Sequence, residues 1–108
     1  MTANDYQKIS HSTLNKAISG QDIMLNAALG IAGEAGEIAD YIKKSLYQGH
    51  YFSKNHLVDE MGDLLWYVAL MATYLGVTLE DVFEYNIEKL ILRYPKGFTE
   101  ENSINREV

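Results

Sequence analysis

The sequence predicts an all-α fold with a four-helix, bundle-like core around an antiparallel central pair of helices. Apolar residues recur with the 3.6-residue period of a helix along most of the chain, and no stretch shows the sustained alternation of a strand. One proline and eight glycines leave little room for a disordered linker. Residues 1–108 are therefore expected to form a single domain, since a chain of this size supports one core.

Local start and stop residues divide the chain into its helices. Gly20 and Gly76 are expected to end the first and third helices, because glycine readily adopts the left-handed conformation that follows a helix. Asp22, Ser53 and Thr78 are expected to cap the second, third and fourth helices. The four predicted helices cover residues 2–19, 23–46, 54–75 and 79–93.

The fourth helix is followed by Tyr94 and Pro95, which interrupt the helical pattern because proline lacks the N–H that a helix interior needs. The residues beyond it are mostly polar. Residues 95–108 are therefore expected to form a polar C-terminal tail.

Two acidic motifs each place two carboxylates three residues apart in an apolar setting. Glu34 and Glu37 belong to the second helix, and Glu60 and Asp63 belong to the third, so each pair projects from nearly one helix face. The short turn between these helices makes them antiparallel neighbours, and the two pairs come level to within about one helical turn. Four carboxylates this close repel one another, and we expect them to surround a divalent cation.

A single pair of this kind usually marks a solvated acidic face, so the surrounding residues matter. Gly30, Gly33 and Gly36 lie inside the second helix and Gly62 inside the third, where each glycine costs about 1 kcal/mol relative to alanine. Another backbone or a ligand is expected to approach the helices closely at these positions. Two level pairs embedded in apolar residues and glycine favour the metal site over the solvated face.

The chemistry of the site is expected to be that of a hard, oxygen-ligated ion. The chain has no cysteine, and carboxylates suit Mg²⁺, with Mn²⁺ as the alternative. A ferritin-type di-iron site would need Glu-x-x-His motifs, but no acid here has a histidine three residues on. His11, His50 and His56 are expected to lie off the carboxylate faces. Mg²⁺ held by few carboxylates keeps positions for water and phosphate oxygens, which suggests attack on a phosphoanhydride.

Five further residues are candidates for contacting such a substrate, and most have a structural alternative. Asn86, Lys89 and Arg93 share one face of the fourth helix, where Asn86 could instead make a structural hydrogen bond. Lys44 follows the first acidic motif and could neutralise a polyphosphate, although lysines there more often mark a solvated helix end. Trp66 follows the second motif and either stacks on a base or belongs to the core.

Charge and hydropathy argue against nucleic-acid and membrane partners. The net charge is −6 and no stripe of Lys and Arg stands out, whereas phosphate-backbone binding needs clustered positive charge. The longest uncharged run, residues 64–79, is too short for a membrane-spanning helix. The absence of cysteine and of an N-terminal signal pattern makes a cytoplasmic protein the expectation.

Five segments of this chain carry a resemblance to a known family: Glu34-Ala35-Gly36-Glu37, Glu60-Met61-Gly62-Asp63 with Leu-Leu-Trp-Tyr after it, Asn86-Ile87-Glu88-Lys89, Arg93-Tyr94-Pro95-Lys96-Gly97-Phe98, and Ser103-Ile104-Asn105-Arg106. They resemble the motifs of the MazG-type nucleoside triphosphate pyrophosphohydrolases in the all-α NTP pyrophosphatase superfamily, which also includes dimeric dUTPases and phosphoribosyl-ATP pyrophosphatase. The likeness runs over residues 25–106, and the chain resembles the small single-domain members of the family.

The resemblance implies Mg²⁺-dependent hydrolysis of a nucleoside or deoxynucleoside triphosphate between the α and β phosphates, for nucleotide-pool control or house-cleaning. It implies that both acidic pairs hold the metal and that Asn86 and Lys89 contact metal-bound phosphates. We expect Glu34 or Glu37 to take a proton from the attacking water, and the resemblance does not decide between them. It also implies a homodimer or homotetramer. Two alternatives stay open: a related pyrophosphatase acting on phosphoribosyl-ATP or another nucleotide, and a non-catalytic helical metal-binding interaction module.

Overall fold

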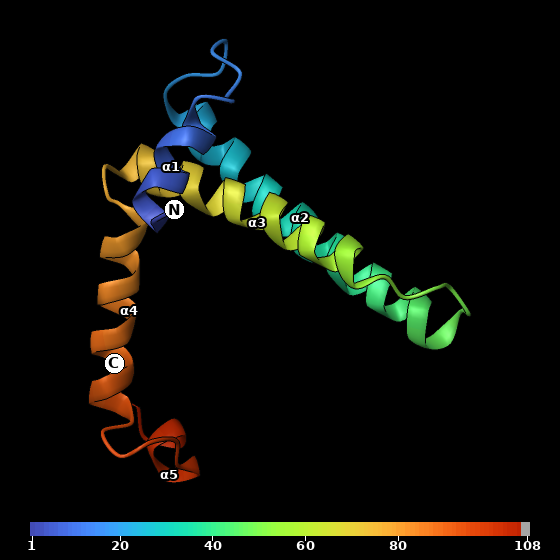
Figure 1. Ribbon diagram of the computed structural model, residues 1–108. Helices are drawn as coiled ribbons and strands as arrows, with labels where there is room; N and C mark the ends of the chain where they lie inside the picture. Colours follow the sequence, from blue (N-terminus) through green and yellow to red (C-terminus); the bar gives the residue numbers. More distant parts are fainter. Residues whose placement is uncertain (107–108) are drawn as a thin grey trace.

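The computed structural model describes residues 1–106, so the last two residues of the predicted tail lie outside the described part. The described residues form five helices and no strand, which confirms the all-α class (Figure 1). The helices are α1 (Ala3–His11), α2 (Gln21–Tyr47), α3 (Lys54–Leu75), α4 (Leu79–Arg93) and α5 (Glu100–Ile104).

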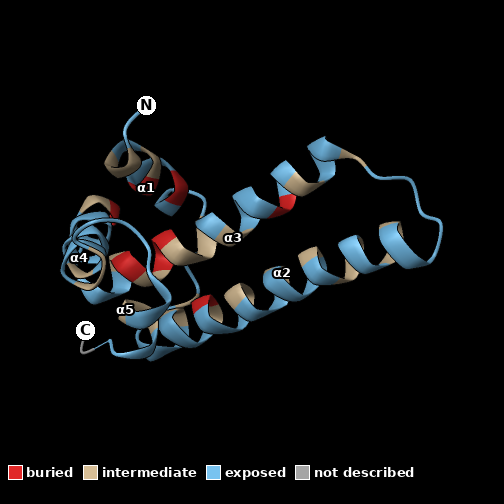
Figure 2. Cartoon of the chain, turned by 90° about the horizontal axis from the view of Figure 1, so that it is seen from below, coloured by how far each residue is buried: buried red, intermediate tan, exposed pale blue. Residues whose placement is uncertain are grey.

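The long helices α2 and α3 form the antiparallel hairpin that the sequence predicts, and α1 lies across the end of α3 that leads to α4 (Figure 1). Most of the buried positions gather where α1, α3 and the start of α4 meet, with others at Ala27 of α2 and at Glu60 farther along α3 (Figure 2). Ala69, Ala72 and Leu79 form the core cluster there, and Tyr6 of α1 packs against it. The rest of the hairpin is a two-helix layer whose outer faces are open.

Helix α4 does not fold back onto the hairpin. The chain bends by 95° between α3 and α4, and Gly76 makes the bend possible with a left-handed φ of 75°. The radius of gyration is 17.1 Å, whereas a compact domain of this length has about 13 Å. The predicted four-helix packing is therefore not closed within one chain, because α4 projects away from the α2–α3 pair (Figure 1).

A buried glutamine of α1 fixes the direction of α4. Gln7 donates through Nε2 to the hydroxyl of Thr73 and to the carbonyl oxygen of Val77, both at 3.0 Å. Its Oε1 accepts a hydrogen bond of 2.7 Å from the backbone N–H of Leu79, the first residue of α4. One side chain thus joins α1, the end of α3 and the start of α4.

The predicted starts of α3 and α4 are confirmed. Ser53 accepts a hydrogen bond from the backbone N–H of His56, and Thr78 forms a reciprocal capping box with Asp81. The predicted cap of α2 is wrong, because α2 begins at Gln21, directly after Gly20, without a side-chain cap. Asp22 instead lies in the first turn of α2, where its charge suits the positive end of the helix dipole.

The first and last predicted boundaries also need correction. Helix α1 ends at His11 rather than near residue 19, because side chains after it bond to nearby backbone and compete with the helix. The hydroxyl of Thr13 donates to Ser10 O, and Asn15 Oδ1 accepts from the N–H of Ala17. Residues 100–104 of the predicted polar tail form the short helix α5. The hydroxyl of Thr99 caps this helix by accepting a hydrogen bond from the backbone N–H of Asn102.

The helix glycines differ from the expectation of close approach. A Cβ at Gly30 would overlap the ring of Tyr67, so something does approach closely there, although it is a side chain rather than the expected backbone or ligand. At Gly33, Gly36 and Gly62 a Cβ would meet nothing within 4 Å in the described part of the chain, so within one chain the expectation is wrong at these three positions.

We expect Gly30→Ala and Gly33→Ala to change the free energy of unfolding in opposite directions, although both lie inside α2. Alanine at Gly33 should add up to about 1 kcal/mol through helix propensity. Alanine at Gly30 should cost about 1–3 kcal/mol, because the Tyr67 ring must move. Urea unfolding in metal-free buffer measures both. A loss of stability at Gly33 would instead place another surface against this face of α2.

No single helix within residues 1–106 has both the length and the apolar character to cross a membrane; α3 and α4 meet that standard only as a pair, across their 95° bend.

Candidate metal centre

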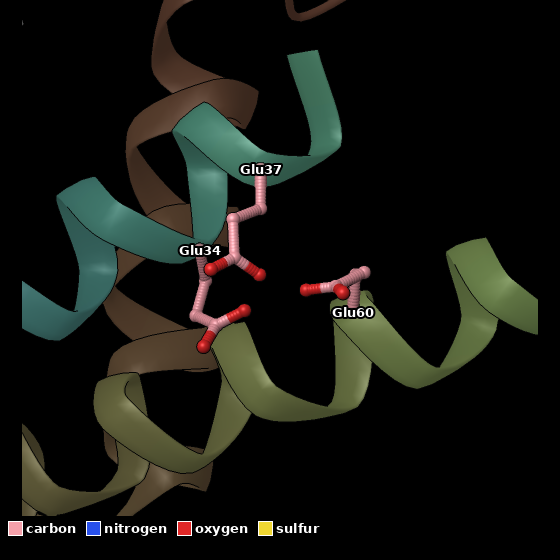
Figure 3. Close-up of side chains that lie close together, drawn as sticks. All are labelled: Glu34, Glu37 and Glu60. Carbon is pink, nitrogen blue, oxygen red and sulfur yellow. The ribbon is translucent and has the colours of Figure 1, made fainter. Parts of the chain in front are cut away.

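Three of the four predicted carboxylate ligands come together between α2 and α3. Glu34 and Glu37 extend from α2 and Glu60 from α3, and all three carboxylates point toward one another (Figure 3). One oxygen from each lies within 4.8 Å of the others. Glu60 is only 9% exposed, Glu34 is half-buried, and Glu37 is exposed. The cluster is therefore closed on the α3 side and open to solvent at Glu37.

The electrostatics of the cluster favour a cation. A hydrogen bond to Glu60, followed by the negative charge of Glu60, raises the pKa of Glu37. A hydrogen bond to Glu34, followed by burial, raises the pKa of Glu60. Without a metal, Glu37 and Glu60 thus keep their protons to a higher pH than isolated carboxyls do.

Two buried carboxylate oxygens also indicate that these residues fit a metal ion. Glu34 Oε2 and Glu60 Oε2 are both buried, and no hydrogen-bond donor within residues 1–106 reaches either atom. A buried carboxylate oxygen without a donor is costly, and a divalent cation would satisfy both atoms at once. The all-oxygen set suits Mg²⁺ or Mn²⁺.

Asp63, the fourth predicted ligand, borders the cluster without joining the group of three. It lines an adjoining hollow of about 380 Å³ with Glu34, Trp66 and Tyr67. Its negative charge contributes to the raised pKa of Glu37. Burial raises the pKa of Tyr6, and the charge of Asp63 is the second cause of that shift. Asp63 therefore faces the space next to the cluster, within electrostatic reach of it.

Trp66 is held rigidly at the edge of this hollow. Its Nε1–H donates to Thr13 Oγ1 at 2.8 Å and to Ser10 O at 3.2 Å. Its ring meets the ring of Tyr67 edge to face, with the centroids 5.1 Å apart. The indole N–H is thus occupied by the segment around the end of α1, and the ring itself borders the hollow.

The candidate substrate contacts of α4 do not reach the cluster within one chain. Glu60 lies about 20 Å along α3 from the bend, by the usual rise per residue, and α4 then turns away from the hairpin (Figure 1). Asn86 is exposed, Lys89 lies beside a separate hollow of about 330 Å³, and the Arg93 guanidinium lies 5.8 Å from the centre of the Tyr94 ring.

Lys44 likewise lies apart from the three glutamates. Its Nζ is 2.8 Å from Asp40 Oδ2, and Lys43 Nζ is 3.3 Å from the other oxygen of the same carboxylate. Hydrogen bonds from Lys44 and then Lys43 hold the pKa of Asp40 below its usual value. In one chain, Lys44 is thus engaged in a surface pair on its own helix.

His56 belongs to the surroundings of the site, which the sequence did not lead us to expect. Its Nε2 lies 3.6 Å from Glu60 Oε1, and its ring stacks on Tyr41 with centroids 4.1 Å apart. The expectation that every histidine lies off the carboxylate faces is wrong for His56. The spacing held the clue, because His56 precedes Glu60 by four residues and therefore shares its helix face.

A helical hairpin with clustered carboxylates places this chain among all-α proteins suited to binding a divalent metal. Residues 24–98 match the family model of the MazG nucleotide pyrophosphohydrolase domain. The match covers most of the chain, so the chain belongs to this family, and membership implies a nucleotide pyrophosphohydrolase.

Two relatives of the chain have names that state no activity. It is 40% identical over 82 residues to the Gene 37 protein of Mycobacterium phage L5, a match that covers 72% of each chain. It is 44% identical over 41 residues to the uncharacterized protein YvdC of Bacillus subtilis (strain 168), covering 38% of this chain and 39% of that protein. No solved structure matches the chain.

The raised pKa values predict how the stability of the metal-free protein depends on pH. Folding raises the pKa of Glu37 and Glu60 above the ordinary 4.5, so the folded state binds more protons than the unfolded state above that pH. The stabilisation from these protons is complete below about pH 4.5 and is lost as the pH rises through the raised values.

The measurement compares the wild type with Glu37→Gln in urea unfolding, in a chelator, from pH 4.5 upward. Relative to the wild type, Glu37→Gln should gain stability as the pH rises. Asp59→Asn, an exposed neighbour on α3, should show no such trend. Parallel curves for the wild type and Glu37→Gln would contradict the carboxylate repulsion.

Proposed function

We propose that this chain hydrolyses a nucleoside or deoxynucleoside triphosphate between the α and β phosphates, in a Mg²⁺-dependent reaction that releases the monophosphate and pyrophosphate. The observation that carries the proposal is the cluster of Glu34, Glu37 and Glu60, with two buried oxygens that receive no donor within the described residues. The chain's membership of the MazG nucleotide pyrophosphohydrolase family supports the same chemistry.

Each carboxylate has a distinct part in this proposal. Glu34 and Glu60 present buried oxygens to Mg²⁺, and Asp63 faces the adjoining hollow, where it can join them. When bound, Mg²⁺ would polarise the phosphate oxygens and lower the pKa of the attacking water. Glu34 or Glu37 accepts the proton of that water as its oxygen bonds to phosphorus and the α–β anhydride bond breaks. Glu37 is the more exposed of the two and can pass the proton to solvent.

The hollow beside the cluster suggests where the nucleoside lies. Trp66 and Tyr67 offer aromatic surface next to Asp63 and Glu34, in a space of about 380 Å³. A ring held by two hydrogen bonds, as Trp66 is, loses little freedom when a base stacks on it. We therefore assign Trp66 to the nucleoside end of the substrate.

We propose that the active form is a homodimer or a homotetramer in which another copy supplies phosphate contacts. In one chain, Asn86, Lys89 and Arg93 are on a helix directed away from the carboxylates, which leaves the site with few cations. Helix α4 also exposes large apolar side chains, including Phe83 and Ile91, which a second copy would cover. Assembly would thus bring α4, and with it the predicted phosphate contacts, to a site in another chain.

The decisive experiment incubates the protein with a panel of canonical and damaged ribo- and deoxyribonucleoside triphosphates plus Mg²⁺, and measures pyrophosphate and monophosphate. Equal amounts of the two products, absent in chelator, are expected for at least one nucleotide. Release of phosphate instead of pyrophosphate would place the cleavage at another bond. A folded protein that binds Mg²⁺ but leaves every nucleotide intact would contradict the proposal. Phosphoribosyl-ATP is included in the panel, since its hydrolysis would shift the substrate but retain the chemistry.

A further inference from the structure

An aromatic stack connects the turn of the hairpin to the carboxylate cluster. The His56 ring lies on the Tyr41 ring, with the centroids 4.1 Å apart and the planes inclined by 28°. On the side of the cluster, His56 Nε2 is 3.6 Å from Glu60 Oε1. The stack therefore ends at the most buried of the three clustered carboxylates.

Tyr41 is a fixed platform for this stack. Its hydroxyl donates to the carbonyl oxygen of Tyr51 at 3.1 Å and accepts from the backbone N–H of Ser53. Its ring also lies 6.1 Å from the ring of Phe52. One side chain of α2 is thus bound to the turn and to the residue that caps α3, so its ring has little freedom to move.

The two oxygens of Glu60 have different surroundings. Oε1 faces His56, whereas Oε2 is buried and receives no hydrogen bond from any described residue. A carboxylate held through one oxygen presents the other in a fixed direction, so a hydrogen bond from His56 to Oε1 would orient Oε2. Metal sites commonly orient their ligands in this way, through partners that do not touch the metal.

We propose that His56 is a positioning residue that holds Glu60 in its metal-binding orientation, with Tyr41 as the platform. This inference rests on the metal centre of the proposed function. At 3.6 Å the contact is longer than a hydrogen bond, and a shift of about 0.5 Å on metal binding would bring Nε2–H to Oε1 at hydrogen-bond length. His56 acts through Glu60 and touches neither the metal nor the substrate.

A purely structural role for His56 makes different predictions. His56 is about half exposed and lies in the first turn of α3, so its stack on Tyr41 could serve only to fasten the two helices. In that case any residue that preserves the stack would preserve every property of the protein. A residue that preserves only the hydrogen-bond donor would not preserve those properties.

The test is calorimetric titration of the full-length protein with Mn²⁺ and with Mg²⁺, using two complementary variants. His56→Phe retains an aromatic ring for the stack but has no donor, and His56→Gln retains an N–H donor but has no ring. We expect His56→Phe to weaken metal binding by about tenfold. His56→Gln should stay within about threefold of the wild type. Urea unfolding in chelator should show that His56→Phe is as stable as the wild type.

The Mg²⁺ dependence of hydrolysis gives a second measurement, which would not change if the role of His56 were purely structural. With His56→Phe, the Mg²⁺ concentration for half-maximal activity should rise about tenfold, and kcat at saturating Mg²⁺ should be restored. Wild-type metal affinity in His56→Phe, or equal weakening in His56→Phe and His56→Gln, would overturn the inference.

Glu60→Gln separates failure of this inference from failure of the metal centre. If Glu60→Gln binds metal weakly while His56→Phe binds like the wild type, only the positioning role is wrong. If Glu60→Gln binds like the wild type, the metal centre and the positioning role are both wrong.

Discussion

Replacing Glu60 by glutamine is expected to abolish the rise in melting temperature that Mg²⁺ gives the wild type, and to slow hydrolysis by on the order of 10³-fold. A bound metal supplies several kcal/mol to such a reaction, and about 1.36 kcal/mol corresponds to each factor of ten in rate. At about a hundred times its dissociation constant, Mg²⁺ should stabilise the wild type by about 2.7 kcal/mol. Thermal melts with and without Mg²⁺, together with pyrophosphate release, measure both effects.

The same substitution should leave the metal-free protein at least as stable as the wild type above pH 4.5, because it removes the Glu60 charge that raises the pKa of Glu37 in the folded state. Loss of the metal site therefore removes the Mg²⁺ response without lowering the stability of the metal-free protein, whereas a folding defect would lower that stability. Asp59→Asn, on the same helix and exposed, should retain both the Mg²⁺ response and the activity. An unchanged Mg²⁺ shift in Glu60→Gln would exclude Glu60 as a ligand.

Gln7→Leu is expected to lower the free energy of unfolding by about 2–4 kcal/mol, a large share of the stability of a small domain. Leucine removes the hydrogen bonds to Thr73, Val77 and Leu79, and the buried N–H of Leu79 then has no acceptor from α1. Urea unfolding measures the loss.

Asn4→Ala is the matched comparison for Gln7→Leu, since it removes one hydrogen bond at the same helix start, the bond that Asn4 Oδ1 accepts from the N–H of Glu80. It should cost about 1 kcal/mol, as the loss of a helix cap usually does. If Gln7→Leu cost no more than Asn4→Ala, the junction between α1, α3 and α4 would be held by packing rather than by Gln7.

The hairpin could be predicted from the sequence because its determinants are local. Helices α3 and α4 begin and end as expected, since Ser53, Gly76 and Thr78 act on their immediate neighbours. The end of α1 was misplaced because the competing bonds of Thr13 and Asn15 are as local as the helix itself, and apolar spacing does not reveal them.

The direction of α4 could not be predicted, because it depends on Gln7, which lies about seventy residues away from the helix start in the sequence. For the same reason, the spacing of Asn86 and Lys89 predicts that they share a helix face, but it does not predict the direction in which that face points. The sequence did place three carboxylates together, through the register of two adjacent helices. His56 was expected to lie off the carboxylate faces because it is close to the turn, but it precedes Glu60 by four residues and so shares its helix face.

The proposed metal ligands and the residues proposed to contact the substrate depend on different regions of the chain. All three clustered glutamates lie on one contiguous hairpin, α2 and α3. Trp66 also lies on α3, but its ring is held by the hydrogen bonds that its N–H donates to Ser10 and Thr13 around the end of α1, and Lys89 lies on α4. Under the proposed function, changes in α1, in the segment after it or in α4 would alter which nucleotide is accepted without disturbing the three glutamates. The substrate of such a chain could thus change while the proposed reaction is preserved.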